Sequence, residues 1–136
     1  MEIVSQSLAG LPSFLLYFAL GVMVFAAFCV IYAAVTPYDE LALIRDGNVA
    51  AAISLGGAVL GFMLPLASAI AHSVGPVDMV VWGVIALVAQ LVVYFLVARL
   101  VPRFGEAIRA GRVAGATLLA ALSVATGILN AACMTY

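Results

Sequence analysis

Residues 44–50 read Ile-Arg-Asp-Gly-Asn-Val-Ala and stand directly before a long apolar segment that continues to Leu66. The pattern I-R-x-G-x-V-A returns at residues 108–114, again before a long apolar segment, and a proline precedes each copy, Pro37 the first and Pro102 the second. Glycine lets the backbone turn just before a helix, and arginine at a lipid boundary reaches polar groups while its stem stays in apolar surroundings. We therefore interpret the chain as a duplicated unit of two membrane helices joined by a polar hairpin.

The composition excludes an ordinary soluble domain. Of the 136 residues, 68% are hydrophobic and 8% are charged, whereas soluble domains carry roughly 25% charged residues. A membrane-spanning helix needs about 20 mostly apolar residues, and four segments qualify, at about residues 13–36, 48–71, 77–99 and 113–134. We predict an all-α integral membrane protein with a single membrane domain over residues 1–136.

The four predicted spans form two hairpins that repeat in parallel, at about residues 11–71 and 76–136. An even number of crossings returns the chain to the same side, so such repeats are related by an axis along the membrane normal. Residues 1–12 are expected to be a short polar-to-mixed tail. The first eleven residues lack the positively charged region of a signal peptide, so span 1 is expected to be a permanent first helix.

The first polar connection carries a helix-start pattern. Thr36 is expected to be the N-cap, Pro37 the first helical residue, and Asp39 the residue that reaches back to the cap. Residues 37–46 can form a short helix at the membrane interface or the first turns of the second span. Gly47 is the break point between these two alternatives, and the sequence leaves both open.

The basic side chains predict the orientation in the membrane. The chain has no lysine, and all five arginines fall in or beside the connections between spans 1 and 2 and between spans 3 and 4. The positive-inside rule places these connections in the cytoplasm, with both termini and the turn between spans 2 and 3 outside. The uneven distribution argues against dual topology. We expect contacts to lipid or to a cytoplasmic partner at Arg45, Arg99, Arg103, Arg109 and Arg112.

Spans 2 and 4 each carry a row of small residues on one helix face. In lipid, small residues mark the places where helix backbones pack closely. We therefore predict that spans 2 and 4 form the tight core, and that spans 1 and 3 lie outside it or face another subunit. The two rows are Ala50, Ser54, Gly57 and Gly61 in span 2, and Ala116, Ala120, Ser123 and Gly127 in span 4.

Polar side chains inside the predicted spans are few. No Asp, Glu, Arg or His lies deep within a span, which disfavours an ion-coupled carrier. Gln90 near the middle of span 3, Asn130 in the outer part of span 4, and Ser54 and Ser68 in span 2 are candidate intramembrane polar contacts. They can join helices, or they can contact a ligand or line a pore.

The sequence lacks the residue patterns of an active site or a metal site. It contains no paired catalytic side chains, phosphate-binding loop or metal-ligand spacing, and His72 has no Cys or His partner at ligand spacing. We therefore assign no catalytic, cofactor-binding or metal-binding residue, and we expect neither an enzyme nor a nucleic-acid partner.

Several further motifs carry a family resemblance. They are I-R-D-G-N at residues 44–48 with alanines at 50–52, G-F-x-L-P-L at 61–66, Trp82-Gly83, Gln90-Leu91, and G-I-L-N-A-A-C-M at 127–134. With these motifs the chain, from about Leu11 onward, resembles the YjfL-like family of small bacterial inner-membrane proteins, domain-of-unknown-function family 350. The resemblance implies a paired two-helix-unit protein of the bacterial inner (plasma) membrane. It implies no activity, cofactor or catalytic residue.

Two functions are compatible with these features. The leading hypothesis is a non-enzymatic membrane scaffold or anchor that forms a parallel homo-oligomer, with the lipid bilayer and possible membrane or cytoplasmic proteins as its partners. The alternative is a small passive channel or transporter, with a polar path between helices lined by Ser54, Gln90, Ser123, Thr126 and Asn130.

Overall fold

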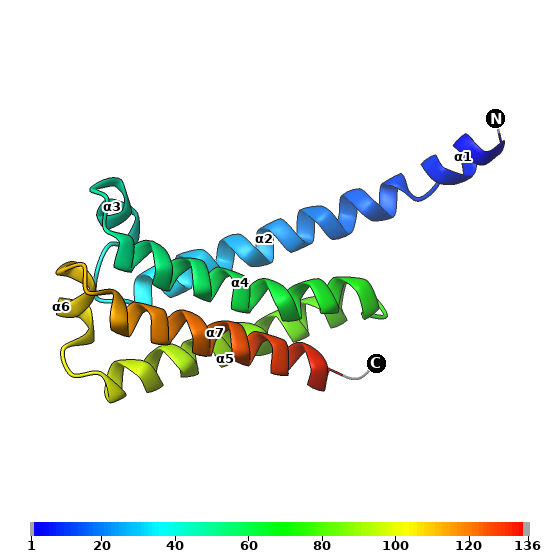
Figure 1. Ribbon diagram of the computed structural model, residues 1–136. Coiled ribbons are helices and arrows are strands. Elements are labelled where there is room, and N and C mark those ends of the chain that lie inside the picture. Colours follow the sequence, from blue (N-terminus) through cyan, green and yellow to red (C-terminus); the bar gives the residue numbers. More distant parts are fainter. Residues whose placement is uncertain (1, 135–136) are drawn as a thin grey trace.

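Four long helices dominate the protein. A computed structural model describes residues 2–134, and this part of the chain contains helices and no strand (Figure 1). Each long helix is long and apolar enough to cross a membrane, and its ends lie within two residues of a predicted span. These helices are α2 (Leu11–Val35), α4 (Val49–His72), α5 (Pro76–Leu100) and α7 (Val113–Cys133). The predicted class, an all-α protein with four transmembrane helices, is confirmed.

Three short helices complete the chain: α1 (Glu2–Leu8), α3 (Glu40–Arg45) and α6 (Phe104–Arg109). The predicted polar tail over residues 1–12 was wrong for residues 2–8, which form α1 and are separated from α2 by a turn at Ala9 and Gly10. No helix was predicted in the connection that forms α6. Both halves of the chain thus run long helix, short helix, long helix, whereas their origin by duplication stays a prediction. The predicted domain limits at residues 1 and 135–136 lie outside the described residues.

The short helices α3 and α6 end in the same way. Gly47 has φ +85° and Gly111 has φ +78°, a backbone conformation that glycine adopts far more readily than other residues. The Gly47 N–H donates to the Ile44 carbonyl at 2.9 Å, and the Asn48 N–H donates to the Leu43 carbonyl at 2.9 Å. In α6 the same bonds run from Gly111 to Ile108 at 3.0 Å and from Arg112 to Ala107 at 2.9 Å. This pair of bonds is the Schellman motif.

The residue after each of these glycines is the N-cap of the next long helix, Asn48 for α4 and Arg112 for α7. The I-R-x-G-x-V-A pattern therefore encodes the end of a short helix and the start of a membrane span. Since α3 ends at this motif, residues 40–45 form a separate helix and are not the first turns of α4.

The predicted cap of the first hairpin was wrong. Thr36 ends α2, and its N–H donates to the Tyr32 carbonyl at 3.0 Å. The N-cap of α3 is Asp39, whose carboxylate accepts a hydrogen bond from the Ala42 N–H at 3.2 Å. Pro37 ends α2 at Thr36, because the residue before a proline is pushed out of helical conformation. Thr36 accordingly has an extended ψ of 140°. The Thr36 hydroxyl bonds to the Ala33 carbonyl and the Glu40 carboxyl and does not cap a backbone N–H of α3.

Helices α4 and α7 form the most intimate contact in the fold and lie side by side along their lengths (Figure 1). A Cβ atom added at Gly57 would overlap Ala120, one added at Gly61 would overlap the Ser123 carbonyl, and one added at Gly127 would overlap the Gly61 carbonyl. The two backbones therefore touch each other without intervening side chains. Helices α5 and α2 pack around this central pair.

Aromatic rings hold α2 to the bundle at its C-terminal end. Phe28 stacks on Phe62 of α4 with ring centroids 4.2 Å apart, and Tyr32 meets Tyr94 of α5 edge to face at 5.7 Å. Toward its N-terminus α2 diverges from α4, and α1 lies well away from the bundle (Figure 1). Phe14 on this half of α2 remains 58% exposed.

We predict that Gly61→Ala destabilises the protein by roughly 1–3 kcal/mol, the usual cost of overpacking a core. The added methyl group would collide with the Ser123 backbone on α7, which cannot move without separating the two helices. The measurement is thermal or denaturant unfolding in detergent micelles.

Gly56→Ala is the matched control, since Gly56 is exposed in the same helix and a Cβ there meets no atom within 4 Å. It should leave stability unchanged or slightly raised, because alanine is the better helix former. Equal effects of the two substitutions would contradict the close α4–α7 contact.

Candidate functional site beside the first hairpin

A carboxyl group is buried in the first hairpin. Glu40 is the first residue of α3, is only 5% exposed, and accepts a hydrogen bond from the Thr36 hydroxyl. When the two I-R-x-G patterns are placed in register, Glu40 corresponds to Phe104, the first residue of α6, which is likewise buried. A phenyl ring thus fills in the second hairpin the position that a carboxyl occupies in the first. Because burying a carboxyl costs free energy, the hairpin fold alone does not explain Glu40.

Tyrosines gather around this carboxyl. The Tyr38 side chain, in the loop before α3, lies close to the side chains of Ser54 of α4 and Tyr94 of α5. The Tyr32 hydroxyl of α2 is buried without a hydrogen-bond partner. It lies close enough to Glu40 and Tyr38 to interact with them electrostatically. Polar groups from three membrane helices and the first hairpin therefore converge at this end of the bundle.

Burial changes the acidity of the hairpin groups. It raises the pKa of the Glu40 carboxyl, and the hydrogen bond from Thr36 opposes this by favouring the charged form. Burial also raises the pKa of the Tyr38 hydroxyl. Glu40 therefore retains its proton to a higher pH than an exposed glutamate does.

A pocket of about 550 Å³ adjoins the carboxyl. Its apolar walls belong to α2 and α4, and its polar end is the hairpin between them. The charged residues of its lining, Asp39 and Glu40, are both acidic. The lining comprises Cys29 and Ala33 of α2, residues 36–41 of the hairpin, and Leu55 and Val59 of α4.

Two polar links join the first hairpin to the second. The Asn48 amide donates to the carbonyls of Ile108 at 2.8 Å and Arg109 at 3.3 Å, while its oxygen accepts from the Ala51 N–H at 3.0 Å. The Arg109 guanidinium in turn donates to the Pro37 carbonyl. These links hold the hairpin that carries Glu40 against α6, and they bring the Arg109 guanidinium to Pro37, one of the residues that line the pocket.

The predicted packing residues lie between α4 and α7. Gly57 faces Ala120, and Gly61 lies against both Ser123 and Gly127. The remaining members of the two rows, Ala50, Ser54 and Ala116, are also buried.

The predicted intramembrane polar residues differ in their surroundings. Gln90 of α5 is buried, and its Nε2 donates to the Ser123 carbonyl at 3.1 Å, while its Oε1 is without a hydrogen-bond partner. The Ser54 hydroxyl donates to the Ala51 carbonyl at 3.1 Å.

Farther along the bundle, the Asn130 Nδ2 is buried without a hydrogen-bond partner, so this amide nitrogen does not bond to Ser68. The Ser68 carbonyl instead pairs with His72 Nδ1 at 3.0 Å. Among residues 2–134, no group of three or more His, Cys, Asp or Glu side chains could hold a metal ion.

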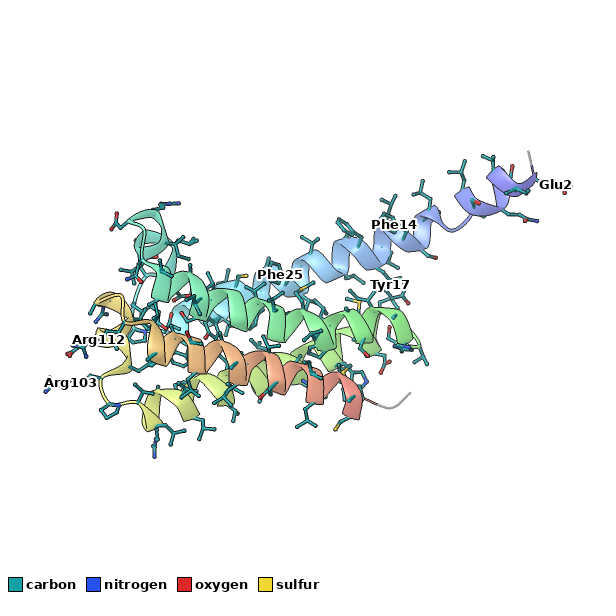
Figure 2. The ribbon with its side chains drawn as sticks, viewed as in Figure 1. Glu2, Phe14, Tyr17, Phe25, Arg103 and Arg112 are labelled. Carbon is teal, nitrogen blue, oxygen red and sulfur yellow. The ribbon has the colours of Figure 1, made fainter. Side chains whose placement is uncertain are left out.

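The arginines gather at one end of the molecule. They lie in or beside α3 and α6, and Figure 2 shows Arg103 and Arg112 projecting there, far from Glu2 at the other end. All five side chains, Arg45, Arg99, Arg103, Arg109 and Arg112, are exposed. Of these, Arg109 is engaged with the Pro37 carbonyl.

Sequence reasoning missed the Glu40 site because Glu40 falls outside the predicted spans. The signal is nevertheless in the pattern. Glu40 stands four residues before Ile44, and Phe104 stands four residues before Ile108, and residues four apart share a helix face. The side of α3 that bears Ile44 therefore also bears the carboxyl.

Taken together, the fold and this site define a polytopic helical membrane protein with two short-helix hairpins at one end and a polar pocket beside the first. Comparison with known proteins assigns the family. The chain belongs to the family described as Domain of Unknown Function (DUF350), whose model matches residues 6–134.

Known relatives of the chain are also membrane proteins. The chain is 39% identical to the UPF0719 inner membrane protein YjfL of Escherichia coli (strain K12) over 129 residues, which cover 95% of this chain and 98% of the relative. It is 32% identical to the UPF0719 transmembrane protein YshE of Bacillus subtilis (strain 168) over 88 residues, 65% of this chain and 66% of the relative. No solved structure matches the chain. The predicted family and the predicted inner-membrane character are confirmed.

We predict that Glu40→Gln makes the stability of the protein less dependent on pH. Because the pKa of Glu40 is raised in the folded state, the folded protein binds more protons than the unfolded chain above about pH 4.3, the usual glutamate pKa. The stabilisation from this proton is complete below that pH and is lost as the pH rises through the folded-state value. Glu40→Gln should therefore be more stable than wild type at neutral pH. Unfolding curves in detergent between about pH 4 and pH 8 measure this difference.

Glu106→Gln on α6 is the control, because Glu106 is exposed. Identical pH profiles for wild type and Glu40→Gln would contradict the assignment of a buried, titrating carboxyl.

Proposed function

We propose that this protein is a non-enzymatic scaffold or anchor of the bacterial inner membrane that assembles as a parallel homo-oligomer through helix α2. The observation that carries the proposal is the position of α2. It is the least buried of the four membrane helices. Its N-terminal part diverges from α4 (Figure 1), although Tyr17 and Leu20 still pack against the cluster of Ala69, Met79 and Met134.

An apolar crevice accompanies this divergence. It has a volume of about 230 Å³ and lies between α2 and α4. Its walls include Gly21, Phe25, Met63, Leu66 and Ile70. Phe18 also lines this crevice and stacks on Phe14 with ring centroids 5.6 Å apart, and the two side chains are 61% and 58% exposed. Membrane helices associate by close side-chain packing, so side chains of a neighbouring α2 suit this crevice better than flexible lipid tails.

The small-residue rows of α4 and α7 leave α2 as the helix available for assembly. Those rows contact each other within one chain, and a surface already occupied cannot join two chains. Phe14 and Tyr17 are three residues apart on α2 and line one shallow pocket with Ile70 of α4. In Figure 2, Tyr17 is on the side nearer the bundle, whereas Phe14 remains 58% exposed. Phe14 therefore marks the face that a second copy would meet.

We predict that cysteine at Phe14 forms a disulfide between copies in native membranes. Both natural cysteines are free and would first be removed by Cys29→Ala and Cys133→Ala. Phe14→Cys in this background should give a dimer band on oxidation, because α2 helices face each other in the proposed assembly. Leu129→Cys on α7 is the control, with a side chain 64% exposed on a different helix.

Dimer bands of equal strength for Phe14→Cys and Leu129→Cys, or none for Phe14→Cys, would overturn assembly through α2. Ion or solute flux through the reconstituted protein, above that of empty liposomes, would instead support the alternative of a passive channel. One observation favours that alternative: the buried Gln90 Oε1 and Asn130 Nδ2 are without hydrogen-bond partners. The bond from Gln90 to Ser123 favours a packing role for this residue.

The proposed orientation has the α3 and α6 end in the cytoplasm and both termini outside. Its support is the gathering of the arginines at that end, since positively charged connections are retained on the cytoplasmic side. The exposed arginines there also suit anionic lipid or an acidic partner.

Cysteine labelling in the same cysteine-free background tests the orientation. Val74→Cys, in the turn between α4 and α5 where the side chain is 91% exposed, should react with a membrane-impermeant maleimide in spheroplasts. Glu106→Cys on α6 should react only after the membrane is permeabilised. The reverse pattern would refute the proposed orientation, and labelling of both positions in intact spheroplasts would indicate dual topology.

A further inference from the structure

The pocket beside Glu40 has the composition of a site for an amphiphile. Its apolar walls reach from Thr36 to Cys29 on α2, about 10 Å along a helix at 1.5 Å per residue. On α4 they reach Leu55 and Val59. Since α2 and α4 are membrane spans, these walls lie at the depth of lipid chains. The polar end at the hairpin lies at the depth of lipid headgroups.

The charge at the polar end selects the headgroup. Asp39 and Glu40 are the charged residues of the lining, so the pocket attracts a cation and repels an anion. A positive group beside a buried carboxylate also offsets part of the cost of its burial. In the second hairpin an apolar side chain, Phe104, fills the corresponding position without such a cost.

The kind of cation follows from the donors and acceptors. A primary ammonium carries three N–H donors and can serve the Glu40 carboxylate and neighbouring oxygens together. A trimethylammonium has no donor and is recognised by cages of aromatic rings, whereas Tyr38 is the single aromatic residue in this lining. Arg109 is outside the lining but donates to the carbonyl of Pro37, which is part of it, so a positive charge stands next to the polar end for a phosphate beside the ammonium.

We infer that this pocket binds a phospholipid with a primary-ammonium headgroup, of the phosphatidylethanolamine class, from the leaflet at the α3 and α6 end. The ammonium meets Glu40, the phosphate lies toward Arg109, and the upper chain region rests between α2 and α4 against Ala33, Leu55 and Val59. This site is independent of the α2 face proposed for assembly and uses other residues.

The test is native mass spectrometry of the full-length protein in detergent, titrated with two lipids that have identical acyl chains. One carries an ethanolamine headgroup and the other a choline headgroup. The wild type should bind the ethanolamine lipid roughly tenfold more tightly, the expected gain from a charge-assisted hydrogen bond. Glu40→Gln should lose this preference, and the exposed control Glu106→Gln should keep it.

Folding of the variants is checked by their unfolding curves, and Glu40→Asp, which keeps the charge, should retain part of the preference. Equal binding of the two lipids by wild type, or an unchanged preference in Glu40→Gln, would overturn the inference. Tighter binding of a phosphatidylglycerol lipid would overturn it too, since an anionic headgroup would bind to the arginines and not to Glu40. Free ethanolamine should not displace the lipid at equal concentration. If it does, the acyl chains contribute nothing to the affinity, and the assignment of the ligand as a lipid is overturned.

Discussion

The fold depends on the direct contact between the backbones of α4 and α7. Gly61 meets Ser123 and Gly127 with no side chain between them, so these two spans form one central unit. Helix α5 packs against this unit and adds the bond from Gln90 to the Ser123 carbonyl. Helix α2 is attached mainly through aromatic rings at one end. Because hydrophobicity does not drive helices together in lipid, this close approach supplies the geometry on which the outer helices are arranged.

Much of this arrangement could be predicted from the residues. Long apolar runs defined the four spans, because the thickness of the bilayer sets their length. The I-R-x-G pattern indicated two related hairpins, although not that each contains a separate helix with a Schellman end. The cap was assigned to Thr36 because the helix-start pattern fits it, but the N-cap of α3 is Asp39 and the Thr36 hydroxyl bonds to the Glu40 side chain. Residues 2–8 lack a strong apolar pattern, and so α1 was not predicted.

Most of the candidate site could not be predicted from the sequence. Tyr32, Tyr38 and Tyr94 are distant in the chain, and only the packing of α2 on α5 brings them to the first hairpin. Glu40 lies outside the predicted spans and was assigned to no site, whereas α3 turns it inward. The two hairpins thus share a backbone plan but differ in chemistry. Phe104 completes the packing of one, and Glu40 gives the other a polar pocket.

The pairing of α4 with α7 also constrains the order of events during synthesis. The chain makes α4 before α5, and α7 is the last of the four spans, so α4 enters the bilayer without its closest neighbour. The connection within each helical hairpin, by contrast, is shaped by the Schellman motif that ends its short helix, whose hydrogen bonds join residues at most five apart. The two helical hairpins can therefore insert one after the other as locally defined units. The glycine-rich face of α4 is therefore without its partner until α7 has been made, and the central pair forms only then.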